Sequence, residues 1–173
     1  MDGIDAAAIK VAIALGSNVG DRHATLTSAL DALAPWVRDL RASSFYDTPF
    51  VGGPAAFDVA QARKAGHYEE NQPSVLNAAA IGVSSLDAHA LLERLLAIER
   101  DFGRTRPYGG APRTLDLDLI LYGDAVIDEP GLVVPHPRFR ERRFVLEPLA
   151  EIAPGWRDPV TGRSIDELLR RLT

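Results

Sequence analysis

The chain has 173 residues, of which 46% are hydrophobic and 25% are charged, and this composition fits one globular domain while excluding a disordered or fibrous chain. It has no cysteine, which excludes disulfides, thiolate metal sites and a cysteine nucleophile and favours a reducing, cytoplasmic location. The formal net charge of -5, from 19 basic and 24 acidic residues, disfavours a broad nucleic-acid-binding surface.

The domain organisation follows from the same pattern. We expect residues 1–173 to form one domain in which residues 1–9 are a flexible leader without a targeting signal. No apolar run has the length of a membrane span, so neither a membrane nor a nucleic acid is an expected partner. We expect a monomer, and a homodimer is the alternative.

The first part of the chain predicts two strands and a helix. Residues 10–15 are mainly apolar and are followed by a Gly-Ser-Asn turn, which is typical of a strand. Asp21 is a candidate N-cap for a helix that ends near Pro35. Residues 37–46 predict a second strand, and residues 49–74 are a long connection rich in proline and glycine, as in a functional lid or a disordered segment.

The second part predicts the remaining elements of an α+β domain. Residues 75–83 form a third strand, and the strongest helix follows, capped by Ser84 or Asp87 and ended by Gly103. A strand with two aspartates comes next, and helices are predicted at 144–150 and 164–172. This order corresponds to a ferredoxin-like βαββαβ antiparallel sheet with helices on one face and C-terminal additions.

The two aspartates are the most informative residues. Side chains on a strand alternate, which places one set on the apolar face: Leu115, Leu117, Leu119 and Leu121. Asp116 and Asp118 therefore share the other face, about 7 Å apart at their backbones. Two like charges at this spacing repel unless a cation lies between them, and Mg²⁺ is commonly held by one or two carboxylates together with substrate phosphates. A solvated strand face is the alternative.

Arginines cluster on either side of this strand. One cluster contains Arg100, Arg104, Arg106 and Arg113, and the other contains Arg138, Arg140, Arg142 and Arg143. The chain has no P-loop, since its only lysines are Lys10 and Lys64. Without a P-loop lysine, phosphoryl transfer needs other cations to neutralise the phosphates, and each guanidinium group can bind two phosphate oxygens at once. The aspartates with Arg104, Arg106 and Arg113 predict a nucleotide-phosphate site, although about half of the arginines are expected to be ordinary surface residues.

Three other residues are candidates for binding. His136 lies between two prolines, so its side chain projects from a stiff loop. Asn77 is a polar residue in an apolar strand, and its amide offers a donor and an acceptor to a heterocycle. Phe144 is a candidate for stacking on a flat ring, with a place in the core as the alternative. The other histidines show no zinc-ligand spacing.

Several motifs together resemble a known family. They occupy residues 14–18, 44–49, 76–79, 98–100, 112–118 and 134–137. Over residues 11–154 the chain resembles the 6-hydroxymethyl-7,8-dihydropterin pyrophosphokinases of folate biosynthesis. The resemblance implies transfer of the β,γ-diphosphate of ATP to the hydroxymethyl oxygen of the pterin, with release of AMP.

The resemblance also implies roles for individual residues. Asp116 and Asp118 would hold two Mg²⁺ ions, and the catalytic set would be Arg104, Arg113, Asp116 and Asp118. The ATP-binding residues would be Glu99, Arg104, Arg113, His136 and Arg142. The pterin would be bound by Thr48, Pro49, Asn77 and Phe144, and residues 49–74 would be a long substrate loop.

The chain departs from the family pattern in three places. Val75 stands where an aromatic residue is common, and Gly109 and Gly110 replace a basic residue and a tryptophan. The connection between Thr48 and Asn77 is also longer than the family leads us to expect. We hypothesise that Tyr68 or Phe57 in this connection supplies the missing ring contact.

Two other functions remain open at this point. A palm-like metal-dependent nucleotidyltransferase would also place paired acids on a ferredoxin-like sheet. It would release pyrophosphate and would need a long surface that binds nucleic acid. A non-catalytic ferredoxin-like ligand-binding module would bind an effector without any dependence on magnesium.

Overall fold

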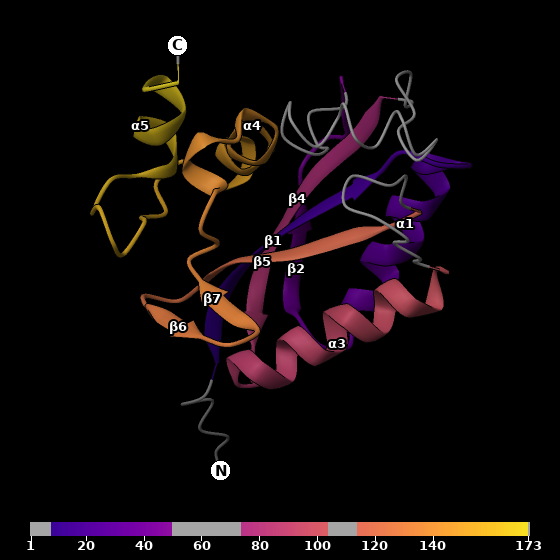
Figure 1. Ribbon diagram of the computed structural model, residues 1–173, viewed down its shortest axis with the longest axis horizontal. Helices are drawn as coiled ribbons and strands as arrows, with labels where there is room; N and C mark the ends of the chain where they lie inside the picture. Colours follow the sequence, from indigo (N-terminus) through magenta and orange to yellow (C-terminus); the bar gives the residue numbers. More distant parts are fainter. Residues whose placement is uncertain (1–7, 50–73, 104–113, 173) are drawn as a thin grey trace, which may run out of the picture.

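The computed structural model describes residues 8–49, 74–103 and 114–172. A five-stranded antiparallel sheet has the order β2-β4-β1-β5, and β3 also pairs with β4 (Figure 1). The strands are β1 (Ile9–Ser17), β2 (Arg38–Ala42), β3 (Tyr46–Thr48), β4 (Val75–Ser84) and β5 (Asp116–Tyr122). The α+β class predicted from the sequence is confirmed.

The predicted strand over residues 37–46 is instead two short strands. β2 pairs with the second half of β4 and β3 with its start, so both follow the same edge. Between them the Ser43 hydroxyl accepts a hydrogen bond from the Ala79 amide at 2.9 Å, while the Ser43 amide donates to the Ala79 carbonyl at 2.8 Å. These contacts hold the break between β2 and β3 against β4.

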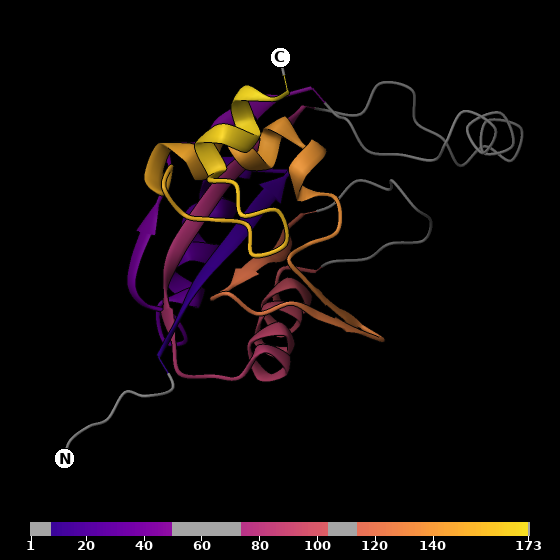
Figure 2. The same ribbon diagram turned by 90° about the vertical axis from the view of Figure 1, so that its left-hand side faces the viewer.

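Helices cover both faces of the sheet (Figures 1 and 2). The sequence predicted helices on one face and C-terminal additions without a place for them, and these additions cover the second face. One face carries α1 (Arg22–Leu33) and α3 (Ala88–Asp101), and the other carries α4 (Arg143–Ile152) and α5 (Ile165–Arg170). The smaller elements are β6 (Ile127–Glu129), β7 (Leu132–Val134) and the 3₁₀ turn η1 (Phe139–Glu141). None of the helices in the described ranges is long and apolar enough to cross a membrane.

Local signals placed the first helices correctly. The Asp21 carboxylate accepts from the Ala24 amide at 3.1 Å and caps α1. The Asp87 carboxylate caps α3 by accepting from the Ala90 amide at 2.8 Å, so Asp87 rather than Ser84 is the cap. Gly103, with φ of 73°, follows the end of α3 in the left-handed conformation that glycine adopts without strain.

Alternation along the strands divides the core into two clusters. Leu115, Leu117 and Leu119 belong to the cluster under α1 and α3, whereas Leu121 belongs to the cluster under α4 and α5. The prediction that Leu121 shares the face of the other leucines is wrong, because the register between β1 and β5 shifts at this point and Ile120 has no partner on β1. Such a bulge adds one residue and reverses the facing of those after it.

Candidate active site

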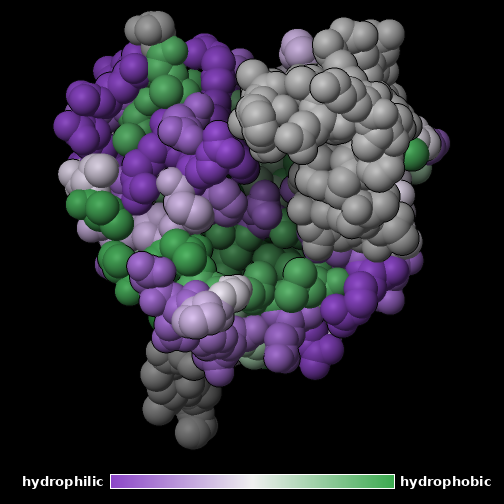
Figure 3. Space-filling model, in the orientation of Figure 1, coloured by the Kyte–Doolittle hydropathy of each residue, from purple (hydrophilic) through white to green (hydrophobic). Residues whose placement is uncertain are grey.

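The two aspartates of β5 lie on the face of the sheet that carries α4. Leu115, Leu117 and Leu119 are buried in the opposite cluster, and alternation turns Asp116 and Asp118 away from it. Both aspartates are half-buried. In the space-filling view, the surface is hollowed between α4 and α3, over β5, with hydrophobic residues in its floor (Figure 3).

A row of paired residues crosses the sheet beside these carboxylates. Asp116 pairs with Gly16, Gly16 pairs with Asn77, and Asn77 pairs with Tyr46. Neighbouring strands are about 4.8 Å apart, so Asp116 and Asn77 are separated by about 10 Å at their backbones. Gly16 lets the Asn77 side chain approach β1 closely, because a Cβ there would lie 3.3 Å from the Asn77 Oδ1 atom and 3.5 Å from the Val75 Cγ1 atom.

The predicted pterin-binding residues Asn77 and Thr48 are in direct contact. Asn77 is 6% exposed, and its Nδ2 atom donates to the Thr48 Oγ1 atom at 2.6 Å. The Thr48 hydroxyl lies 3.4 Å from the Val75 carbonyl oxygen. Pro49 follows β3 and is exposed. Thr48 and Asn77 therefore form one polar group where β3 meets the start of β4.

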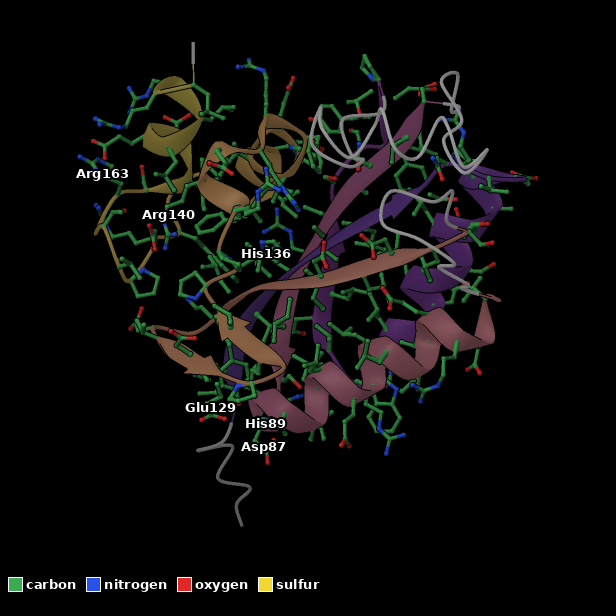
Figure 4. All side chains as sticks on the ribbon, viewed as in Figure 1. Asp87, His89, Glu129, His136, Arg140 and Arg163 are labelled. Carbon is green, nitrogen blue, oxygen red and sulfur yellow. The ribbon has the colours of Figure 1, made fainter. Side chains whose placement is uncertain are left out.

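His136 lies between α4 and β5 (Figure 4). Its amide donates to the Ile120 carbonyl at 3.0 Å, which attaches the loop to β5, and its Nδ1 atom accepts from the Arg138 amide at 3.2 Å. Burial lowers the pKa of His136, the charges of Arg142 and Arg138 lower it further, and Asp116 acts in the opposite direction. The neutral ring accepts at Nδ1, so its proton is on Nε2.

The second arginine cluster divides into different roles. The Arg142 guanidinium lies 5.6 Å from the centre of the Phe144 ring, so these predicted ATP and pterin residues are neighbours at the start of α4. Arg140 instead donates to the fully buried Asp158 at 2.8 Å, toward the loop before α5 (Figure 4). Arg138 and Arg143 form exposed ion pairs, with Glu141 at 2.9 Å and Glu147 at 3.3 Å.

Glu99 makes a contact that neither the sequence pattern nor the resemblance implied. Its side chain is on α3 and is 2% exposed, and its Oε2 atom accepts from the Leu117 amide at 2.7 Å. Leu117 lies between the two aspartates. Glu99 therefore holds the outer edge of β5 at the point from which both carboxylates project.

Some predicted residues lie outside the described ranges. They are Arg104, Arg106, Arg113, Gly109, Gly110, Phe57 and Tyr68, together with residues 1–7 of the leader and most of the 49–74 connection. Sequence reasoning also missed Arg22, Asp47 and Glu151, which hold β3 in place. The sequence did contain a signal for Asp47. Alternation along Tyr46, Asp47 and Thr48 indicates a short strand in which the charged residue faces away from the other two.

The donor groups fit one kind of metal. Within the described ranges, no three His, Cys, Asp or Glu side chains gather as a metal-binding group. His89 and Glu129 are 2.7 Å apart, but they join α3 to β6, below His136 in Figure 4. The paired carboxylates of β5 fit Mg²⁺, which uses one or two protein carboxylates when phosphates and water supply the other ligands.

Comparisons with known proteins identify the family. The model of the 7,8-dihydro-6-hydroxymethylpterin-pyrophosphokinase family matches residues 12–154. The chain is 39% identical over 162 residues to the 2-amino-4-hydroxy-6-hydroxymethyldihydropteridine pyrophosphokinase of Synechocystis, covering 92% of this chain and 74% of that protein. It is 39% identical over 157 residues to the Bacillus subtilis protein of that name, covering 90% of this chain and 84% of the relative.

A solved structure shows the same fold. The crystal structure of Plasmodium falciparum HPPK-DHPS superposes with a TM-score of 0.68 at 14% sequence identity, covering 95% of this chain and 44% of that longer one. At this identity the superposition supports the fold alone. The family model and the similar sequences carry the assignment, and the chain belongs to the 7,8-dihydro-6-hydroxymethylpterin-pyrophosphokinase family.

Proposed function

We infer that the chain is an ATP-dependent pyrophosphokinase of folate biosynthesis, acting on 6-hydroxymethyl-7,8-dihydropterin. The pterin hydroxymethyl oxygen attacks the β-phosphorus of ATP and loses its proton. The bond from the β-phosphorus to the oxygen that bridges it to the α-phosphorus breaks, and AMP leaves with that oxygen. In-line transfer of this kind depends on positioning and on neutralising charge more than on a strong base.

The row from Asp116 through Gly16 to Asn77 carries the site assignment. It places carboxylates suited to metal-bound phosphates about 10 Å, two strand spacings, from an amide suited to a heterocycle. Both ends face α4, and a side chain at the glycine between them would crowd Asn77. A triphosphate lying over Gly16 would bring its β-phosphorus toward a pterin held at Asn77.

The nucleotide half of the site is proposed on the β5 side. Asp116 and Asp118 would hold two Mg²⁺ ions, which neutralise phosphate charge when bound. Neutral His136 offers one donor, its Nε2–H, to a phosphate or sugar oxygen, and Arg142 lies beside it. Glu99 contributes by holding Leu117. Arg104 and Arg113 complete the proposed charge neutralisation and, with the two aspartates, the catalytic set.

The pterin half is proposed on the β3 and β4 side. The hydrogen bonds from Asn77 Nδ2 to the Thr48 Oγ1 atom and the Val75 carbonyl fix the orientation of the amide, and its Oδ1 atom is proposed to accept from the edge of a pterin ring. Pro49, which follows Thr48, and Phe144 at the start of α4 are proposed as the other pterin-binding residues. In fold terms, we assign β1-α1-β2-β4-α3-β5 to the ferredoxin-like βαββαβ core, with α4 and α5 as additions.

Product analysis tests this function. Purified protein is incubated with ATP, Mg²⁺ and 6-hydroxymethyl-7,8-dihydropterin, and the products are identified by phosphorus NMR. AMP and pterin diphosphate are expected, whereas ADP would indicate an ordinary kinase and unchanged ATP a binding module. Asp116→Asn and Asp118→Asn should each reduce kcat by at least about 100-fold. Asp128→Asn on the exposed strand β6 is the matched control and should keep wild-type turnover.

A further inference from the structure

β3 is a three-residue strand that pairs with β4 alone among the described strands, although it carries Thr48. Strands this short are marginal unless other contacts hold them. We propose that Arg22 is a positioning residue for the pterin half of the site, because it clamps β3 to the start of β4. This inference rests on the proposed function, since the pterin site is part of it.

Arg22 joins segments that are distant in the sequence. Its Nη1 and Nη2 atoms donate to the Oδ1 and Oδ2 atoms of Asp47 at 3.0 and 3.2 Å. The Nη1 atom also donates to the Ser74 carbonyl at 2.9 Å and to the Ser74 hydroxyl at 3.1 Å. One guanidinium at the start of α1 therefore binds the strand β3 and the residue that precedes β4.

The geometry calls for an arginine. The planar guanidinium matches both oxygens of a carboxylate and still has an N–H directed at a third group, which a lysine ammonium cannot reproduce. Hydrogen bonds from Arg22 and Ser74 lower the pKa of Asp47 to about 2, so the carboxylate is charged at any pH at which the enzyme would be assayed.

The opposite face of β3 is held by α4. The Glu151 carboxylate accepts from the Tyr46 hydroxyl at 2.6 Å and from the Ser44 amide and hydroxyl at 3.0 and 3.1 Å. These hydrogen bonds lower the pKa of Glu151. Alternation turns Tyr46 and Asp47 to opposite faces, so β3 is bound to α4 on one side and to α1 on the other.

Thr48 is the next residue after the Arg22 contact. It pairs with Val75, the residue after Ser74, and its hydroxyl accepts from the Asn77 amide. When Arg22 holds Asp47 against Ser74, it also fixes the separation of Thr48 from Asn77. Loss of the clamp should therefore misplace the pterin-binding pair while leaving the aspartates of β5 in position.

Steady-state kinetics of Arg22→Gln tests the proposal. We expect the KM for the pterin to rise about five- to tenfold, while the KM for ATP and kcat change less than about twofold. Asp47→Asn should act in the same way, and the double variant should be no worse than Arg22→Gln, because both changes break one interaction. Arg170→Gln, which breaks an Arg–Asp pair within α5, is the control and should match the wild type.

A second measurement separates the possible failures. Amide hydrogen exchange of residues 46–48 should be faster in Arg22→Gln than in the wild type and unchanged in Arg170→Gln. An unchanged pterin KM in an active Arg22→Gln enzyme, or equal changes in the constants for both substrates, would overturn the clamp. A wild-type protein that forms no AMP would overturn the proposed function, and unchanged exchange would then reject the clamp as well.

Discussion

Removing the Glu99 carboxylate tests how the aspartate strand is held. Glu99 is 2% exposed and accepts from the Leu117 amide at 2.7 Å. A hydrogen bond to a charged group contributes about 1.5–3 kcal/mol, and the lost burial of one methylene adds about 0.8 kcal/mol. We therefore expect Glu99→Ala to lower the free energy of unfolding by about 2.3–3.8 kcal/mol. Glu99→Gln keeps an acceptor oxygen and should lose only about 1–1.5 kcal/mol.

Urea denaturation followed by circular dichroism measures these differences, provided that the m-values agree. Because Leu117 lies between Asp116 and Asp118, Glu99→Ala should also raise the Mg²⁺ concentration needed for half-maximal turnover, and Glu99→Gln should raise it less. A Glu99→Ala protein within about 0.5 kcal/mol of the wild type, or a Glu99→Gln protein that is equally destabilised, would refute the reasoning.

Three further predictions concern the site floor, the fold and the metal. Gly16→Val should raise the pterin KM without changing the far-ultraviolet circular dichroism, because a Cβ at this position would lie 3.3 Å from the Asn77 Oδ1 atom and would displace the amide; an unchanged KM would contradict this close approach of Asn77 to Gly16. Burial raises the pKa of Asp158, but hydrogen bonds led by Arg140 outweigh it and lower the pKa to about 2 from 3.8. Its stabilising contribution is therefore complete above about pH 4 and is lost as the pH falls toward 2. Arg140→Met should remove about 3–5 kcal/mol of stability at pH 7 and reduce the loss of stability between about pH 4 and pH 2, as measured by urea denaturation. An unchanged loss of stability in this pH range would contradict the role of the Arg140–Asp158 ion pair. Chelation of Mg²⁺ should abolish AMP formation but leave the unfolding temperature of the nucleotide-free protein unchanged, and a lowered temperature would instead indicate a structural metal.

Elements encoded by local signals were predictable from the sequence. Asp21 and Asp87 cap helices whose leucines recur at helical spacing, and both helices formed as expected. The shared face of Asp116 and Asp118 was equally accessible, because alternation along a strand is a local property. The family resemblance supplied the reaction, which no spacing of residues could identify by itself.

Features that depend on contacts between distant residues were not predictable. Leu121 changes face because β5 bulges against β1, and the break at Ser43 depends on Ala79 of β4. The contact of Glu99 with Leu117 likewise exists only once α3 has packed beside β5. Asn77 lies on the same face as Asp116, opposite Gly16, because of the strand register, which the surrounding sequence does not encode locally.

The central claim is that the carboxylates of β5 bind the divalent metal that accompanies the nucleotide. Electron paramagnetic resonance of Mn²⁺, titrated in the presence of a non-hydrolysable ATP analogue, tests it directly. The wild-type protein should bind Mn²⁺ together with the analogue, and the double variant Asp116→Asn/Asp118→Asn should bind it at least about tenfold more weakly. Equal Mn²⁺ affinity in the two proteins would contradict the account.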